Sequence, residues 1–243
     1  MLIIAPSKVK GRKGMFPNLI EEPAYRDKEY VFRDRLHAGE LLSKKLQKHA
    51  GKEEVVVLAI PAGGVPVGCV VARELRVRFD VIVVRKIQVP WNTEAGFGAL
   101  TWSGEVILNM PLLRRLGLGK EEVDVAVHKT NALVQERLRK FRGDRRFPDL
   151  KGKAVILVDD GLASGFTMLA AVRSVRREGP KTVTVAVPTA SIGAVKLLAP
   201  EADEVVALSV RSGPIFAVAD AYERWYDLSD EEVLKFLREI CQY

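Results

Sequence analysis

The sequence predicts an α/β fold, a twisted parallel sheet with helices on both faces. Short unbroken apolar runs, typical of strands that are buried on both faces, occur at residues 55–60 and 155–158, and further strands are predicted at residues 183–187 and 204–208. Apolar residues at helical spacing occupy the stretches between them, at residues 34–50, 66–75, 121–142, 166–178 and 192–198. Because strands and helices alternate along the chain, we expect the strands to pair in parallel through βαβ units.

The composition fits a soluble globular protein with a large core. The 243 residues are 48% hydrophobic and 28% charged, and no apolar run approaches the roughly 20 residues that a membrane helix needs. The first residues lack the apolar core of a secretory signal, so we expect a cytoplasmic protein. The two cysteines, Cys69 and Cys241, form no CxxC motif. Neither a disulfide framework nor a thiolate metal site is expected.

The net charge of +7 raises the question of a polyanionic partner. Much of it lies in two basic clusters, which consist of Lys8, Lys10, Arg12 and Lys13 and of Arg137, Arg139, Lys140, Arg142, Arg145 and Arg146. Binding of nucleic acid is one interpretation. The second cluster, however, closes a predicted helix, where cations complement the helix dipole, and the same field attracts a phosphate-rich small molecule. Neither cluster carries interleaved aromatic residues, so nucleic acid is not the expected partner.

The chemistry is concentrated in residues 155–167, VILVDDGLASGFT. Asp159 and Asp160 follow directly after a buried strand, at the end where open α/β sheets bind their ligands. Gly161 and Gly165 free the backbone to curl, so that successive N–H groups and the start of the next helix face one anion. The stretch therefore predicts carboxylates for a diol or a metal ion, beside a phosphate loop. The alternative is a plain surface turn whose acids are solvated.

This stretch resembles the ribose-phosphate loop of the type I phosphoribosyltransferases, enzymes that act on 5-phosphoribosyl-1-pyrophosphate. The resemblance covers about residues 33–235 and is nearest to a subgroup of predicted phosphoribosyltransferases without an assigned substrate. It implies transfer of the 5-phosphoribosyl group to a nitrogenous acceptor with release of pyrophosphate, on a fold with a small hood and a β-hairpin lid. Asp159 and Asp160 would be catalytic residues that hold the ribose 2- and 3-hydroxyls. The 5-phosphate would be bound by Gly161, Leu162, Ala163, Ser164, Gly165, Phe166 and Thr167.

A second loop, residues 61–66 with the sequence PAGGVP, joins an earlier strand to a helix. It resembles the pyrophosphate loop of the same family, in which the amides of Ala62, Gly63 and Gly64 would bind pyrophosphate. A tight strand-to-helix turn is the alternative. The closest relatives commonly carry Arg at the position of Ala62, so one pyrophosphate-neutralising charge is absent from this chain.

The next predicted strand, residues 80–85, ends in Arg85 and Lys86. These cations are further catalytic candidates, because they would face the same crevice and compensate the charge of pyrophosphate. Solvated surface cations are the alternative. Residues 88–109 contain glycines between short β-like segments and predict a hairpin, which the resemblance makes the catalytic lid. The lid residues that would fold over the substrate are Trp91, Glu94 and Trp102. A plain β-hairpin is the alternative.

The resemblance also implies Mg²⁺ as the cofactor. Mg²⁺ binds pyrophosphate and hydroxyl oxygens and keeps several waters, so we expect no direct protein ligand, with Asp159 and Asp160 nearby. The expected partners are phosphoribosyl pyrophosphate and an unknown acceptor, with no membrane. A homo-oligomer, a dimer, is expected.

The predicted domain organisation is simple. Residues 1–32 lack a clean period and form an N-terminal extension, and residues 33–243 form the phosphoribosyltransferase-like domain, with residues 211–243 as a C-terminal hood and helix. That helix is predicted to start at Ser229, with Glu232 three residues on. Four aromatic residues before it would stack a base or, as we favour, pack against the helix. They are Phe216, Tyr222, Trp225 and Tyr226.

Ala163 limits which acceptor bases are expected to react. In relatives that use hypoxanthine or guanine, an Asp directly before the hydroxyl residue of the phosphate loop faces N7 of the purine as proton acceptor. Here Ala163 precedes Ser164, so both bases are expected to be poor substrates unless Glu94 reaches the base from the lid. Adenine, orotate and a non-nucleobase amine stay open. The alternative function is a non-catalytic regulator that senses a nucleotide or phosphoribosyl pyrophosphate, with nucleic acid as a further ligand, because such a protein would tolerate Ala62.

Overall fold

The structure is a computed structural model, and it describes residues 16–241. Six strands of this part form one parallel sheet, in the order β1-β9-β8-β7-β2-β3. They are β1 (Leu19–Ile20), β2 (Val55–Ala59), β3 (Arg78–Val81), β7 (Ala154–Val158), β8 (Thr182–Ser191) and β9 (Glu204–Arg211). The predicted fold class, a parallel sheet flanked by helices, is confirmed.

Helices cover both faces of this sheet, as predicted. On one face lie α1 (Arg35–Lys45) and α2 (Gly64–Leu75), and on the other lie α5 (Phe166–Arg177) and α6 (Ile192–Leu198). Alternate residues of β7 supply the two cores: Ile156 packs with α1 and α2, whereas Leu157 packs with α5 and α6. β7 is therefore buried on both sides, which explains its unbroken apolar sequence. A short 3-10 turn at Gln47–His49 follows α1.

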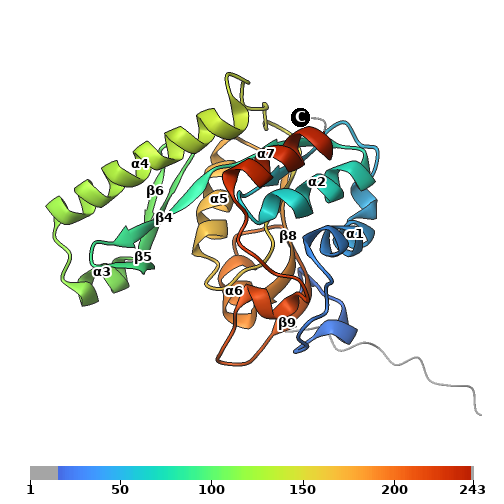
Figure 1. Ribbon diagram of the computed structural model, residues 1–243, viewed down its shortest axis with the longest axis horizontal. Coiled ribbons are helices and arrows are strands. Elements are labelled where there is room, and N and C mark those ends of the chain that lie inside the picture. The colour runs from blue at the N-terminus through green and yellow to red at the C-terminus, as the bar shows by residue number, and fades with distance from the viewer. Residues whose placement is uncertain (1–15, 242–243) are drawn as a thin grey trace, which may run out of the picture.

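A second sheet forms a lobe that projects from the main body (Figure 1). It contains the antiparallel strands β4 (Val84–Val89), β5 (Asn92–Thr101) and β6 (Val106–Leu108), with α3 (Met110–Leu116) and α4 (Lys120–Arg142). The expected antiparallel hairpin within residues 88–109 is thus present, and α3 was not predicted.

The strand predicted at residues 80–85 is wrong as a single element. Val81 ends β3, where it pairs with Ala59, whereas Val84 begins β4, where it pairs with Thr101. The apolar run that joins the two strands is buried throughout. Its sequence therefore shows no break where the chain leaves one sheet for the other.

The segment 211–243, expected as the hood, packs on the main body as far as it is described. After a 3-10 turn at Val218–Ala221, α7 (Asp230–Glu239) lies against α2 (Figure 1). The predicted capping box is confirmed, because Glu232 N–H donates to Ser229 Oγ at 3.2 Å and Ser229 N–H donates to Glu232 Oε2 at 2.9 Å.

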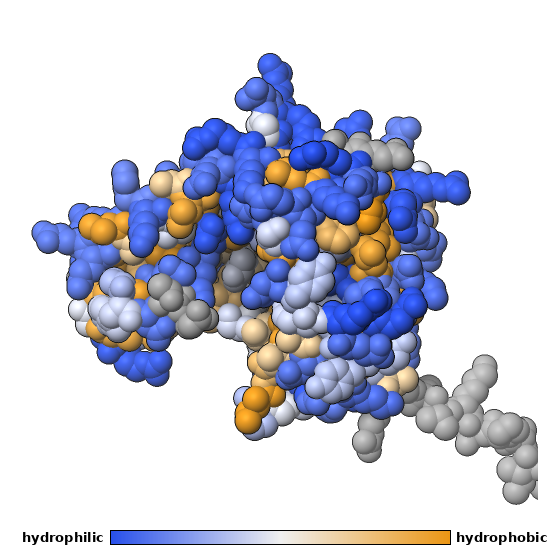
Figure 2. All heavy atoms as spheres, in the orientation of Figure 1, coloured by the Kyte–Doolittle hydropathy of each residue, from blue (hydrophilic) through white to orange (hydrophobic). Residues whose placement is uncertain are grey.

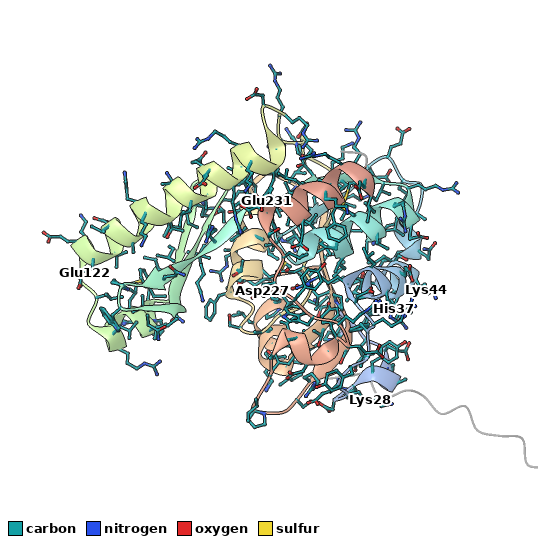
Figure 3. All side chains as sticks on the ribbon, in the orientation of Figure 1. Lys28, His37, Lys44, Glu122, Asp227 and Glu231 are labelled. Atoms are coloured by element: carbon teal, nitrogen blue, oxygen red, sulfur yellow. A yellow bond between two sulfur atoms is a disulfide. The ribbon has the colours of Figure 1, made fainter. Side chains whose placement is uncertain are left out.

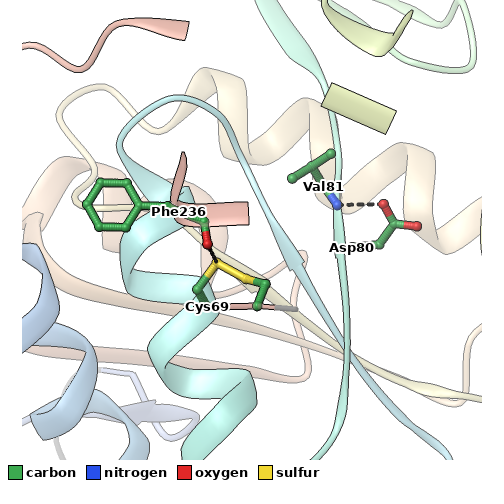
Figure 4. The surroundings of a disulfide bond; sticks show 5 residues. Cys69, Asp80, Val81 and Phe236 are labelled. Atoms are coloured by element: carbon green, nitrogen blue, oxygen red, sulfur yellow. Dashed lines mark hydrogen bonds between the residues drawn. A yellow bond between two sulfur atoms is a disulfide. The ribbon is translucent and has the colours of Figure 1, made fainter. Parts of the chain in front are cut away.

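The expectation of no disulfide is wrong. Cys69 of α2 and Cys241, just after α7, form a disulfide whose Cα atoms are 5.1 Å apart (Figure 4). The two cysteines are 172 residues apart in sequence. The packing of α7 on α2 brings the two cysteines together, and no short sequence motif predicts this packing.

The described part of the predicted N-terminal extension, residues 16–32, is packed on the domain. Leu19–Ile20 form β1, which adds an edge to the sheet beside β9, and a 3-10 turn follows at Pro23–Tyr25. The first basic cluster lies outside the described residues. None of the helices between residues 16 and 241 is both long and apolar enough to cross a bilayer. The face shown in Figure 2 is mostly hydrophilic, with separate hydrophobic patches.

Candidate active site

Two of the predicted loops meet at the carboxyl ends of neighbouring parallel strands. β7 leads into Asp159 and Asp160, and β2 leads into the loop that carries Gly63 and Gly64 and contains a cis peptide bond between Pro61 and Ala62. A Cβ atom on Gly63 would overlap the Asp160 carboxylate, and one on Gly64 would lie 2.7 Å from the carbonyl oxygen of Val158. Only glycine allows this approach of the two loops.

Asp160 has a buried cation as its partner. The Nε of Arg35, in the first turn of α1, donates to Asp160 Oδ2 at 2.8 Å, and the two side chains are 8% and 13% exposed. Arg35 Nη1 donates to the carbonyl of Tyr226 at 2.9 Å, and its guanidinium lies 3.9 Å from the centre of the Trp225 ring. Sequence analysis missed Arg35, because one arginine 125 residues from its partner belongs to no motif.

The two carboxyl groups differ electrostatically. Burial raises the pKa of Asp159 well above its usual value, and the charge of Asp160 raises it further. Burial also raises the pKa of Asp160, but Arg35 opposes this shift through its charge and its hydrogen bond. Arg35 therefore compensates the charge of Asp160 directly. Among the described residues no cation contacts Asp159, whose Oδ1 accepts from the N–H of Asp160 at 2.9 Å, and the charge of Arg35 opposes the rise of its pKa only in part.

The predicted phosphate loop is fixed to β8. Leu162 N–H donates to the carbonyl of Thr189 at 3.0 Å, and Ser191 Oγ donates to the carbonyl of Ala163 at 2.6 Å. Gly165 adopts the left-handed conformation, with φ of 76°, directly before α5. In the part of the chain that the structure describes, no backbone carbonyl accepts from the N–H groups of residues 163–165. Together with the first turn of α5, these amides form a cradle suited to an anion.

Arg85 and Lys86 lie in β4, at the base of the projecting lobe, rather than at the end of a strand of the main sheet. Burial lowers the pKa of Arg85, the charge of Arg137 lowers it further, and Asp230 opposes the shift. Both cations line a cavity of about 480 Å³ between β4 and α4. The described surroundings of Arg85 are thus the lobe and α7, and contact with pyrophosphate stays a prediction.

Two of the predicted lid residues, Trp91 and Trp102, lie at opposite ends of β5. Trp91 is exposed at the turn between β4 and β5, whereas Trp102 follows the other end of the ten-residue strand β5 and stacks on Phe147 at 5.1 Å. The base of the hairpin is anchored, because the hydroxyl of Ser174 lies 3.0 Å from that of Thr101. The side chain of Glu94 lies outside those that the structure describes.

Two of the four aromatic residues of the C-terminal segment, Tyr222 and Trp225, pack against the acid loop, Arg35 and each other, whereas packing against the helix α7 stays a prediction. Tyr222 is buried, donates its hydroxyl to the carbonyl of Asp160 at 2.6 Å, and contacts Trp225 with ring centres 5.2 Å apart. Tyr226 is half exposed, and Phe216 is partly buried. The rings of Tyr222 and Trp225 thus support the acid loop and cover Arg35.

The second basic cluster is largely used in internal contacts. Arg142 donates to the Asp80 carboxylate at 2.8 and 2.9 Å, in a pair that is 8% and 11% exposed. Lys140 Nζ lies 3.0 Å from Asp230 Oδ2 and 3.2 Å from Glu231 Oε1. Glu231 lies in the first turn of α7 (Figure 3). This part of the charge therefore joins α4 to β3 and α7.

These features agree with comparisons to known proteins. Residues 34–209 match the family described as "Phosphoribosyl transferase domain", and the chain belongs to this family. It is 39% identical over 207 residues to two Mycobacterium tuberculosis proteins, "Putative phosphoribosyl transferase MT0597" of strain CDC 1551 / Oshkosh and "Putative phosphoribosyl transferase Rv0571c" of strain ATCC 25618 / H37Rv. The match covers 85% of this chain but only 46% of each relative, so the chain spans about half of their length.

A solved structure shares the fold. The crystal structure of TT1426 from Thermus thermophilus is 41% identical and superimposes with a TM-score of 0.71, covering 86% of this chain and 98% of the other. The match of residues 34–209 and the two relatives confirm the phosphoribosyltransferase family that the sequence resembles.

Proposed function

We propose that the protein transfers the 5-phosphoribosyl group from phosphoribosyl pyrophosphate to a nitrogenous acceptor and releases pyrophosphate. The observation that carries this proposal is the meeting of the acid loop and the pyrophosphate loop at Gly63, beside a phosphate cradle that opens α5. Phosphoribosyl pyrophosphate has three polar parts that such a site would bind: a 5-phosphate, a diol and a pyrophosphate leaving group.

The residues would act mainly by positioning and electrostatics. The bond between the anomeric carbon and the pyrophosphate oxygen breaks, a bond to the acceptor nitrogen forms, and positive charge develops on the ribose ring. The amides of residues 163–167 would hold the 5-phosphate, and those of residues 62–64 the pyrophosphate. The carboxylate of Asp159 would hold a ribose hydroxyl and stabilise the developing charge.

The donors at the site fit Mg²⁺ only as a substrate-bound ion. Within residues 16–241, no group of three or more His, Cys, Asp or Glu side chains is placed to hold a metal. Asp159 and Asp160 offer oxygen ligands, which Mg²⁺ prefers, but Arg35 already binds Asp160. We therefore assign Mg²⁺ to pyrophosphate and hydroxyl oxygens of the substrate, near these acids, where it would neutralise the leaving group.

The acceptor is constrained by Ala163. Its side chain cannot accept a proton, and its carbonyl is bonded to Ser191. A positioned general base contributes about 10²–10⁴-fold to a rate, so hypoxanthine and guanine should react more slowly than the best acceptor by a factor in this range. A kcat/KM for either base within about tenfold of the best acceptor would contradict this.

The test of the proposal is release of pyrophosphate from phosphoribosyl pyrophosphate, with Mg²⁺ and a panel of purines, pyrimidines and amines. Turnover should appear with at least one acceptor and should be lost in Asp159→Asn. Asp227→Asn, which changes an exposed carboxylate outside the two loops, should leave it unchanged. Binding of phosphoribosyl pyrophosphate without turnover for any acceptor would overturn catalysis and favour the sensing regulator.

A further inference from the structure

Arg35 is held from three sides. Its Nε donates to Asp160 at 2.8 Å, its Nη1 donates to the carbonyl of Tyr226 at 2.9 Å, and the Trp225 ring covers the guanidinium. The guanidinium is planar and carries donors in a fixed fork, so one residue can satisfy a carboxylate and a carbonyl at once while stacking on an aromatic ring.

This clamp acts on the junction of the two substrate loops. Asp160 Oδ2, the atom that Arg35 binds, is also the atom nearest to the position of a Cβ on Gly63. Tyr222 fixes the backbone of the same residue through the Asp160 carbonyl. Both the side chain and the main chain of Asp160 are thus held, and the pyrophosphate loop packs directly against its carboxylate.

We propose that Arg35 is a positioning residue, which holds Asp160 against Gly63 and so leaves Asp159 as the carboxylate that contacts the ribose hydroxyls. The role of Asp159 rests on the proposed function. The clamp itself rests on geometry alone. Asp160 is 13% exposed and bound by Arg35, whereas Asp159 is partly buried, and within the described part of the chain its carboxylate accepts from the N–H of Asp160 and contacts no cation.

A second buried pair provides a matched control. Arg142 and Asp80 are as buried as Arg35 and Asp160 and form hydrogen bonds of equal length. They join α4 to β3, and their ion pair lies outside both loops. Substitution of Arg142 therefore reports the effect of losing a buried ion pair as such.

The clamp is tested without any ligand by amide hydrogen exchange. Arg35→Met should raise amide exchange in residues 62–64 and 159–161 by at least about tenfold, whereas Arg142→Met should leave both loops at the wild-type rate. Arg35→Lys should give an intermediate result, because it keeps the charge but loses the fork. If Arg35→Met does not fold, Arg35→Lys carries the test. Wild-type exchange in both loops of the Arg35 variants would overturn the clamp.

The different roles of Asp159 and Asp160 are tested by calorimetry, which measures the affinities for ribose 5-phosphate and 2-deoxyribose 5-phosphate. Wild-type protein should prefer the ribose by about 10- to 100-fold, the loss expected for a hydrogen bond to a charged group. Asp159→Asn should lose this preference. Arg35→Met and Asp160→Asn should bind both sugars more weakly but keep the preference, and Arg142→Met should match wild type.

Loss of the preference in Asp160→Asn, with its retention in Asp159→Asn, would overturn the assignment of the two acids. If the wild-type protein binds neither sugar phosphate and releases no pyrophosphate, the proposed function and the sugar contact of Asp159 both fail. The exchange rates then still confirm or overturn the clamp.

Discussion

Replacing Gly63 by Ala would place a methyl group in the space that the Asp160 carboxylate occupies. Gly63 has φ of −60° and ψ of −34°, a conformation that alanine adopts readily, so backbone strain does not contribute. The conflict is steric, and either the carboxylate or the loop has to move. Because Arg35 holds the carboxylate, rotation of the side chain would break a buried ion pair.

The change in the free energy of unfolding depends on whether the Asp160 carboxylate or the loop that carries Gly63 moves. Uncoupling one partner of a buried pair costs about 3–5 kcal/mol, whereas overpacking that shifts a backbone costs about 1–3 kcal/mol. The loop should therefore retreat, and Gly63→Ala should lower the free energy of unfolding by about 1–3 kcal/mol. Since the pyrophosphate amides move with the loop, affinity for phosphoribosyl pyrophosphate should also fall.

Denaturant unfolding and calorimetry measure the two effects. Gly213→Ala is the control, because a Cβ there meets no atom closer than 3.8 Å and the residue has no positive φ; its effect should stay within about 0.5 kcal/mol. A Gly63→Ala protein as stable as this control, with unchanged affinity, would show that the two loops are not in contact and would refute the reasoning.

Three further predictions concern charge, the disulfide and the lid. Burial raises the pKa of Asp159 in the folded state. The free energy of unfolding therefore falls as the pH rises from the pKa of an unfolded Asp, about 3.9, through the higher pKa of Asp159 in the folded protein. Asp159→Asn should therefore raise the free energy of unfolding at neutral pH, whereas Asp160→Asn should lower it by about 3–5 kcal/mol by leaving Arg35 unpaired. Denaturant titrations in which both variants change the free energy of unfolding in the same direction would contradict this. Cys241→Ser should lower the free energy of unfolding by about 2–5 kcal/mol and make stability independent of reductant. An oxidised wild-type protein no more stable than Cys241→Ser would exclude the disulfide between Cys69 and Cys241. Amide exchange at residues 90–97 should be fast in the free protein and slow with phosphoribosyl pyrophosphate and Mg²⁺. Equal exchange in both states would leave the hairpin as scaffold.

The sheet and the loops could be predicted because their signals are local. A strand covered on both faces has to be apolar throughout, and the loop that follows needs glycine where another backbone or an anion approaches. Residues 155–167 contain all of these features without interruption. Their consequences, β7, the acid pair and α5, appear in the structure in the expected order.

The contacts that complete the site could not be predicted, because they depend on tertiary packing. Arg35 lies 125 residues before Asp160, and Cys69 lies 172 residues before Cys241. Neither pair has a local pattern that distinguishes it from an exposed arginine or an isolated thiol. The end of β3 and the start of β4 could not be predicted for a local reason. The chain stays buried as it passes from one sheet to the other, so its apolar sequence shows no break there.

The site also depends on chain beyond the family match, which ends at residue 209. Trp225 covers the guanidinium of Arg35, and the Tyr226 carbonyl accepts one of its hydrogen bonds. Without this cover the pair of Arg35 and Asp160 would become solvent-exposed, and exposed pairs contribute only about 0–1 kcal/mol. The acid loop would then lose the restraint that holds it beside Gly63. The strand ends thus supply the groups that face a ligand, while the C-terminal segment excludes water from the cation that keeps one of those groups in place.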